Sequence, residues 1–299
     1  MNSQLTSQFT SPRELRVSSW LHRHEKSRLA ILLSAPLFWL VVAYLGSLFS
    51  MFISAFWSVD SFTGSLVKTF TWDNFHTLIT ADVYRRIALR SISVAFLVTL
   101  IDAVLALPIA LYMAKVLSPR KRQVLVVLLL LPLWASYLVK AYAWRTLLAH
   151  GGVLDWLLHP FGLGTPGYGL AATTIVLCYL WLPYMILPIY AGLERLPNSL
   201  LEASSDLGAG GGRTFKSIVL PLLYPSLIAG SIFTFSLSLG DYITVKIVGG
   251  KTQLFANVIY DNVGTAGNLP FAAAAAMVPV ITVLGYLYMV RRTGALENL

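Results

Sequence analysis

Two acidic residues stand inside or directly beside long apolar runs, where an ionisable side chain is rare. Asp102 interrupts a stretch of valine, leucine and alanine, and Asp241 directly follows an apolar run. A charged group at bilayer depth costs about 2.5–3.5 kcal/mol on insertion scales, so it usually faces a cavity or a partner. Three kinds of chemistry use such residues: ion binding, binding of a cationic solute, and peptide hydrolysis by a pair of aspartates.

The residues around these aspartates do not fit an enzyme. Intramembrane aspartyl proteases pair a Tyr-Asp with a later Gly-x-Gly-Asp, whereas here Ser238-Leu239-Gly240-Asp241 lacks the first glycine and Tyr260-Asp261 follows it. The run GAGGGRT at residues 208–214 is not a phosphate-binding loop. That loop needs G-x4-G-K-[ST] after a strand, and the basic residue here is Arg213. We therefore expect no ATP site and no covalent chemistry in this chain.

The composition is that of a protein that crosses a membrane several times. Of 299 residues, 57% are hydrophobic and 12% are charged, against roughly 25% charged in soluble domains, and the mean hydropathy is +0.71. A single cysteine, Cys178, and five scattered histidines offer neither a disulfide framework nor metal-ligand spacing. Basic loops on one side of a membrane explain the net charge of +9 more simply than nucleic-acid binding does.

Six apolar stretches are long enough to cross roughly 30 Å of hydrocarbon. They predict an all-α polytopic protein with six transmembrane helices, at residues 29–59, 87–114, 124–148, 170–193, 217–240 and 269–290. The first stretch is too long for a signal-peptide core and lacks a convincing cleavage site, so we expect it to be retained. The predicted division is a tail of residues 1–28, a first helix of 29–59, a core domain of 60–292 and a tail of 293–299.

The basic residues indicate the orientation. Of the 22 lysines and arginines, 14 lie in the N-terminal tail, the turn at 115–122, the segment at 194–216 and the C-terminal pair. Because lysine and arginine concentrate in cytoplasmic loops, this bias places both termini and the 194–216 segment in the cytoplasm.

The 194–216 segment is the longest polar interruption in the C-terminal half. Ser199 and Glu202 fit a capping box at a helix start, and Gly208 is expected to end that helix in the left-handed conformation. Gly210–Gly212 should weaken the following turn, by about 1 kcal/mol per glycine relative to alanine. Four apolar residues fall at helical spacing on one face: Leu196, Leu200, Ala203 and Leu207. The segment therefore predicts a helix–glycine–helix elbow, typical of a docking element.

The elbow also carries a specific motif. Glu202-Ala203-Ser204 is followed after three residues by Gly208, and after nine more by Ile218-Val219-Leu220-Pro221. This resembles the EAA loop of ABC-importer permeases, E-A-A, three residues, G, nine residues, I-x-L-P, with Ser204 in place of the third-position alanine. The resemblance implies a type I importer permease fold. It also implies that six residues contact a cytoplasmic ATPase: Glu202, Ala203, Ser204, Asp206, Leu207 and Gly208.

Three further segments are similar to the spermidine/putrescine branch of these permeases. They are PLWASYLVKAYAWRTLL (132–148), SLGDYITVKIVGG (238–250) and NLPFAAAAAMV (268–278). This resemblance implies a non-enzymatic subunit of a bacterial inner membrane importer, which moves a small solute, most closely a polyamine. Its implied partners are a second, different permease, two cytoplasmic ATPases and an extracytoplasmic solute-binding protein, with no nucleic acid. It implies no cofactor in this chain, because ATP and Mg would bind to the ATPase subunits.

Three residues in or beside the spans are candidates for the lining of the transport route: Asp241, Tyr242 and Asp102. Asp241 and Tyr242 fit either an acid and a belt tyrosine at the membrane interface, or a route that attracts an organic cation. From the residues alone another class stays open, an ion-coupled secondary transporter or channel with Asp102 as the ion site.

Overall fold

The computed structural model describes residues 33–60 and 62–291, which divide into two parts that are described separately. The first part is one apolar helix of 22 residues, Leu33–Ser54, long enough to cross a bilayer. It contains a π-helical segment, η1 (Leu40–Leu45), followed by α3 (Gly46–Ser54). The two predicted tails, 1–28 and 293–299, lie outside the described residues.

The first helix ends at Ser54, before the expected bound at residue 59. The carbonyls of Ala55 and Trp57 each accept a hydrogen bond from Asn74 Nδ2 at 2.8 Å. Because Asn74 satisfies these carbonyls, the chain can leave the helix at this point. The chain then forms a two-stranded antiparallel ribbon of β1 (Ser58–Val59) and β2 (Leu66–Val67), followed by α4 (Asp73–Thr80). Four aromatic rings stack beside the ribbon: Phe56, Phe70, Trp72 and Phe75.

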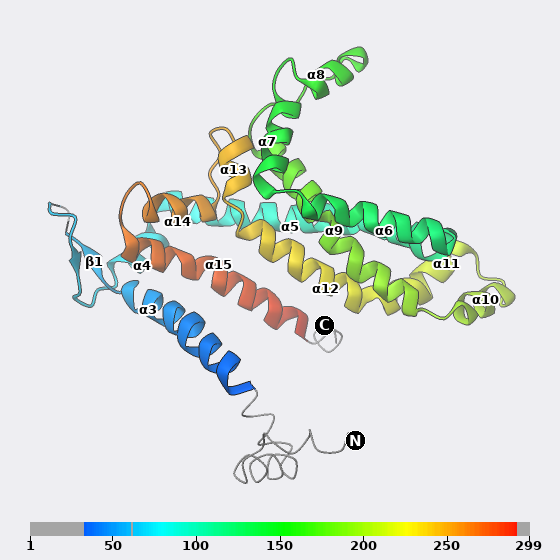
Figure 1. The fold of residues 1–299 in the computed structure, drawn as a ribbon, viewed down its shortest axis with the longest axis horizontal. Coiled ribbons are helices and arrows are strands. Elements are labelled where there is room, and N and C mark those ends of the chain that lie inside the picture. The colour runs from blue at the N-terminus through cyan, green and yellow to red at the C-terminus, as the bar shows by residue number, and fades with distance from the viewer. Residues whose placement is uncertain (1–32, 61, 292–299) are drawn as a thin grey trace, which may run out of the picture. The chain divides into compact units, whose positions relative to one another are not determined.

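Three long helices form the centre of the second part and lie side by side (Figure 1). They are α5 (Asp82–Leu111), α9 (Leu170–Arg195) and α12 (Leu220–Leu239), the second, fourth and fifth predicted spans. α5 continues into a π-helical end, η2 (Tyr112–Val116). Buried side chains from all three helices share one core: Ala106, Ala110, Met113, Ala114, Met185, Ile186, Ile189, Leu193, Val219 and Leu223.

Two glycines allow α9 and α12 to approach closely. A Cβ added at Gly230 would lie 2.7 Å from Met185 Sδ and 3.2 Å from Met185 Cα, and one added at Gly192 would lie 2.3 Å from Ser226 Oγ. Lipid tails are as apolar as leucine, so tight van der Waals packing, rather than exclusion of water, holds such helices together. The smallest side chains therefore stand where the two backbones meet.

The third predicted span, 124–148, is not one straight helix. It consists of α6 (Pro119–Trp134) and α7 (Tyr137–Leu148), which meet at a bend of 93°. The break follows from extended backbone at Ala135 and Ser136, where ψ is 141° and 136°. The third predicted span is therefore this bent pair. The described residues hold five helices long and apolar enough to cross a membrane, and six only if the bent pair is one crossing.

Shorter helices connect and flank these spans. α15 (Leu269–Val290) has the bounds expected of the sixth span, and the Asn268 side chain caps it by accepting from Phe271 N. The remaining elements are α8 (Val153–Leu158), η3 (His159–Phe161), α10 (Asn198–Asp206), α11 (Gly211–Thr214), η4 (Phe215–Val219), α13 (Ile243–Val248) and α14 (Phe255–Val263).

The close approach of α9 and α12 predicts that Gly230→Val destabilises the helix bundle. A valine would meet Met185 backbone as well as its side chain, and such overpacking typically costs about 1–3 kcal/mol. Thermal unfolding of the detergent-purified protein, followed by loss of the monodisperse peak, should begin at a lower temperature. Gly285→Ala is the control, because its Cβ meets nothing within 4 Å. Equal melting of both variants would contradict tight packing at Gly230.

Candidate functional site

The elbow begins with α10, and its start differs from the predicted one. α10 begins at Asn198, directly after Pro197, and no side chain caps its first turn. The predicted capping box of Ser199 and Glu202 is therefore wrong. Pro197 holds the capping position and has no acceptor in its side chain, so Ser199 lies within the first turn instead of preceding it.

The end of α10 is the predicted glycine cap. Gly208 has φ +77°, in the left-handed region, where a Cβ would be strained. The amide of Gly208 donates to Ser205 O at 2.9 Å, and the amide of Ala209 donates to Ser204 O at 3.0 Å. These two bonds form a Schellman motif, which satisfies the last carbonyls of the helix and reverses the chain.

α10 turns one narrow face inward and leaves its apolar residues outside. Leu201 packs against the helix core, and the buried Ser204 hydroxyl bonds Thr214 Oγ1 at 2.8 Å. Of the predicted leucine face, only Leu196 is buried, at 5% exposed. The other residues of that face and the two acids stand in the open: Leu200, Glu202, Ala203, Asp206 and Leu207. Leu207 is 87% exposed, so this chain provides it with almost no packing.

The second half of the elbow is held by few side chains. Gly210 precedes α11, Gly211 and Gly212 form its first turn, and a Cβ at any of the three would meet nothing within 4 Å. α11 then continues through η4 into α12, so the polar segment runs directly into the fifth span.

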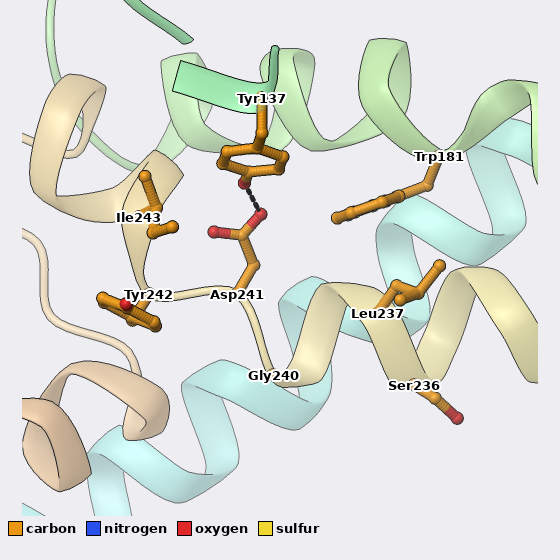
Figure 2. Close-up of a pocket in the computed structure, with 8 residues that line it drawn as sticks. All are labelled: Tyr137, Trp181, Ser236, Leu237, Gly240, Asp241, Tyr242 and Ile243. Carbon is orange, nitrogen blue, oxygen red and sulfur yellow. Dashed lines mark hydrogen bonds between the residues drawn. The ribbon is translucent and has the colours of Figure 1, made fainter. Parts of the chain in front are cut away.

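A small pocket of about 260 Å³ lies at the other end of α12 (Figure 2). Its wall combines one acid with aromatic rings from three elements: Asp241 and Tyr242 after α12, Tyr137 on α7 and Trp181 on α9. Tyr137 and Trp181 lie with ring centroids 6.1 Å apart. An acid among aromatic faces is the arrangement that attracts organic cations.

Asp241 is also a structural residue. Its carboxylate accepts hydrogen bonds from the Tyr137 hydroxyl, from Thr244 N at 2.9 Å and from Thr244 Oγ1 at 3.0 Å. These bonds order the start of α13 and tie it to α7. Burial raises the pKa of the Asp241 carboxyl, and the hydrogen bonds from Tyr137 and Thr244 oppose that shift.

Tyr242 stacks on Tyr260, which in turn contacts an ion pair. Its ring stacks on Tyr260 at 4.6 Å, and Lys246 Nζ lies 4.2 Å from the Tyr260 ring while bonding Asp261 Oδ1 at 2.6 Å. The positive charge of Lys246 is thus paired with an acid.

Asp102 does not belong to this pocket. Its side chain is fully buried in α5, and neither carboxylate oxygen has a hydrogen-bond partner in the described part of the chain. The neighbouring polar group is the Cys178 thiol on α9. The structure therefore separates two acids that sequence reasoning grouped as one candidate route.

Sequence reasoning missed residues on both sites. Tyr137 and Trp181 join the pocket from 104 and 60 positions away from Asp241, and nothing in their local sequence distinguishes them from membrane-belt aromatics. Lys115 bonds Asn198 and Arg122 bonds Glu194, both at the start of the elbow. From the sequence, these two basic residues indicated only the membrane orientation. A basic turn opposite helix ends was the available signal for that contact.

Comparison with known proteins identifies the chain's relatives. Residues 78–291 match the family described as binding-protein-dependent transport system inner membrane component. The inner membrane ABC transporter permease protein YdcU of Escherichia coli K12 is 41% identical over 302 residues, which cover 95% of each chain. The spermidine/putrescine transport system permease protein PotB of the same organism is 34% identical over 232 residues, covering 76% of this chain and 83% of PotB.

Solved structures support the same fold. A bacterial ABC transporter involved in the import of the acidic polysaccharide alginate matches with a TM-score of 0.70 at 17% identity, over 93% of this chain and 99% of its own. A second structure, of the alginate transporter in complex with an alginate pentasaccharide-bound periplasmic protein, matches with a TM-score of 0.69 at 17% identity, over 93% and 98%.

The glycine cap predicts that Gly208→Val loosens the elbow. A non-glycine residue in the left-handed conformation costs about 1–2 kcal/mol, so the amides of α10 should exchange roughly 5- to 30-fold faster. Hydrogen–deuterium exchange of the purified complex measures this. Gly211→Ala is the matched control, because its Cβ has open space and alanine favours helix, and it should slow exchange or leave it unchanged. Equal acceleration by both variants would rule out the left-handed cap as the cause.

Proposed function

The chain belongs to the family of binding-protein-dependent transport system inner membrane components, and on that premise we propose that it carries a polyamine across the bacterial inner membrane. As a member it is a permease subunit of an ABC importer and not an enzyme. This membership replaces the ion-coupled transporter or channel that Asp102 suggested from the sequence.

The exposed face of α10 supports a docking role for the elbow. Leu207 and Leu200 lie in water, while Gly208 and the Ser204–Thr214 bond hold the helix in one shape. An apolar face kept exposed on a rigid element favours an interface with another subunit. We assign that subunit as a cytoplasmic ATPase, with Glu202 and Asp206 meeting basic groups around the leucines.

The remaining partners follow from the same assignment. A second, different permease completes the route, two ATPases bind ATP and Mg, and a solute-binding protein delivers the cargo on the opposite face. Both termini and the elbow lie in the cytoplasm in this arrangement. Closure of the ATPases on ATP would then displace α10, and differential contacts in the two states would shift the spans between inward-facing and outward-facing forms.

The single observation that favours a polyamine is the identity of the relatives, several of which are named spermidine/putrescine permeases, for example at 31% and 34% identity. The pocket of Asp241, Tyr137 and Trp181 agrees in chemistry. An ammonium group beside the Asp241 carboxyl would favour its ionised form. Aromatic faces add cation–π attraction of about 0.5–2 kcal/mol each.

The docking role predicts that Leu207→Ala weakens ATPase binding without changing the fold. Burying a leucine side chain is worth about 1.5–3 kcal/mol, so the affinity of the nanodisc-embedded permease pair for the ATPase should fall roughly tenfold or more. Glu202→Ala should act in the same direction, and ATP-driven uptake should fall with both. Leu163→Ala, at another exposed leucine far along the chain, serves as control. Unchanged affinity in both elbow variants would remove the elbow from the interface.

The polyamine proposal predicts ATP-dependent uptake of labelled putrescine by proteoliposomes that hold the whole importer. Spermidine should compete, whereas butanediol, of the same length but uncharged, should not. Absence of uptake, or equal competition by the diol, would overturn the substrate class.

The pocket predicts a larger effect of charge than of the tyrosine hydroxyl. Asp241→Asn should lower putrescine uptake about tenfold, the worth of a charge-assisted hydrogen bond. Tyr137→Phe removes one hydrogen bond but keeps the carboxylate, so uptake should stay closer to normal. If both variants lose uptake equally, Asp241 serves only to order α13.

A further inference from the structure

We propose that Lys115 anchors the elbow to the end of α5, so that α10 and the second span move as one body. The proposal rests on the proposed function, in which α10 receives the motion of an ATPase. It concerns how that motion enters the membrane helices. Lys115 is a positioning residue in this scheme, because it acts through α10.

The anchor is a pair of hydrogen bonds that cross more than eighty positions of sequence. Lys115 Nζ lies 3.0 Å from Leu196 O and 3.0 Å from Asn198 Oδ1. Leu196 follows the end of α9, and Asn198 is the first residue of α10. One ammonium group thus binds both sides of the Pro197 joint. The last carbonyls of a helix have no partner within it, so a lysine is well suited to bind there.

Arg122 supports the same corner from the next helix. Its Nε donates to Met113 O at 3.1 Å and its Nη2 donates to Ala114 O at 2.8 Å, both on η2. Its Nη1 contacts Glu194 Oε1, near the end of α9, at 3.1 Å. The planar fork of arginine suits several acceptors at once. The ends of α5 and α9 and the start of α6 are therefore joined around the turn that carries Lys115.

The other end of the elbow is joined by a weaker, uncharged connection, the hydrogen bond between Ser204 Oγ and Thr214 Oγ1 at 2.8 Å. After the Gly208 cap, the chain passes through Gly210–Gly212, and three glycines without neighbouring atoms form a compliant joint. A displacement of α10 would be absorbed there before it reached α12. At the start of the elbow, Lys115 bonds residues on both sides of Pro197, and Arg122 bonds Glu194 at the end of α9. These charged donors transmit the displacement of α10 to α5 and α9.

The test compares variants of the complete importer in proteoliposomes. Lys115→Met should lower solute uptake per ATP hydrolysed about tenfold, the loss expected from one charge-assisted anchor, while basal ATP hydrolysis and membrane abundance stay normal. Lys115→Arg should restore much of the ratio, because its fork can reach the same acceptors. Asn198→Ala removes one acceptor of Lys115 and keeps the other, the Leu196 carbonyl. Its uptake per ATP hydrolysed should lie between those of Lys115→Met and Lys115→Arg. Lys121→Met is the matched control, as an exposed lysine of the same turn.

Two outcomes would overturn the anchor. One is an unchanged ratio in Lys115→Met, and the other is a loss shared equally by Lys121→Met. If Lys115→Met lowered the abundance and melting temperature of the complex but left the uptake per ATP hydrolysed unchanged, Lys115 would be a purely structural residue. The proposal would again fail.

A cross-linking experiment tests the anchor without a transported solute. Lys115→Cys with Asn198→Cys, in a chain whose buried Cys178 is replaced by alanine, should react with a short bifunctional thiol reagent. The proposal requires equal cross-linking in the nucleotide-free and the ATP–vanadate-trapped complex. Cross-linking in only one state means that the two parts separate, and it overturns the anchor. Absent putrescine uptake by the wild-type complex would instead refute the substrate and leave this result standing.

Discussion

Each break in a membrane helix leaves backbone groups without partners, and this chain has few polar side chains to satisfy them. Several of these polar side chains lie at the helix breaks. Asn74 binds the carbonyls that follow the first helix, Arg122 binds those at the end of α5, and Lys115 binds the one after α9. Asp241 accepts from the first amides of α13 in the same manner. Hydrogen bonding at helix ends therefore decides where the chain turns, and the functional regions lie at these turns.

The same rule explains why the two functional regions differ in stiffness. At the pocket of Asp241, a carboxylate, a tyrosine and a threonine join α7 to α13, so the aromatic wall is fixed in place. At the elbow one side of α10 is bound by charged donors and the other side runs into glycines. A transport subunit needs both properties, because a binding surface must keep its shape while the spans around it tilt.

Much of the fold could be predicted from the sequence, and the failures have physical causes. Length and hydropathy place α9, α12 and α15, and the need for a positive φ identifies Gly208. The 93° bend could not be predicted, because it depends on two extended residues inside an apolar run with one nearby proline. The capping box failed because Pro197, two residues before Ser199, is the residue that precedes the helix. The link between Asp241 and Tyr137 is tertiary, and no local pattern records it. The motif from Glu202 to Pro221 predicted the family from the sequence, and the match of residues 78–291 to the family confirmed it.

The exposure of Leu207 has a consequence for the life of the polypeptide before assembly. Under the proposed docking role, Leu207 stays in water until an ATPase covers it, so a newly made copy carries an exposed apolar group. Copies synthesised in excess would associate with one another through this exposed leucine, or would be recognised by the proteases that degrade unassembled subunits. Balanced production of all the subunits would therefore protect this chain, and the same leucine would mark whether assembly has been completed.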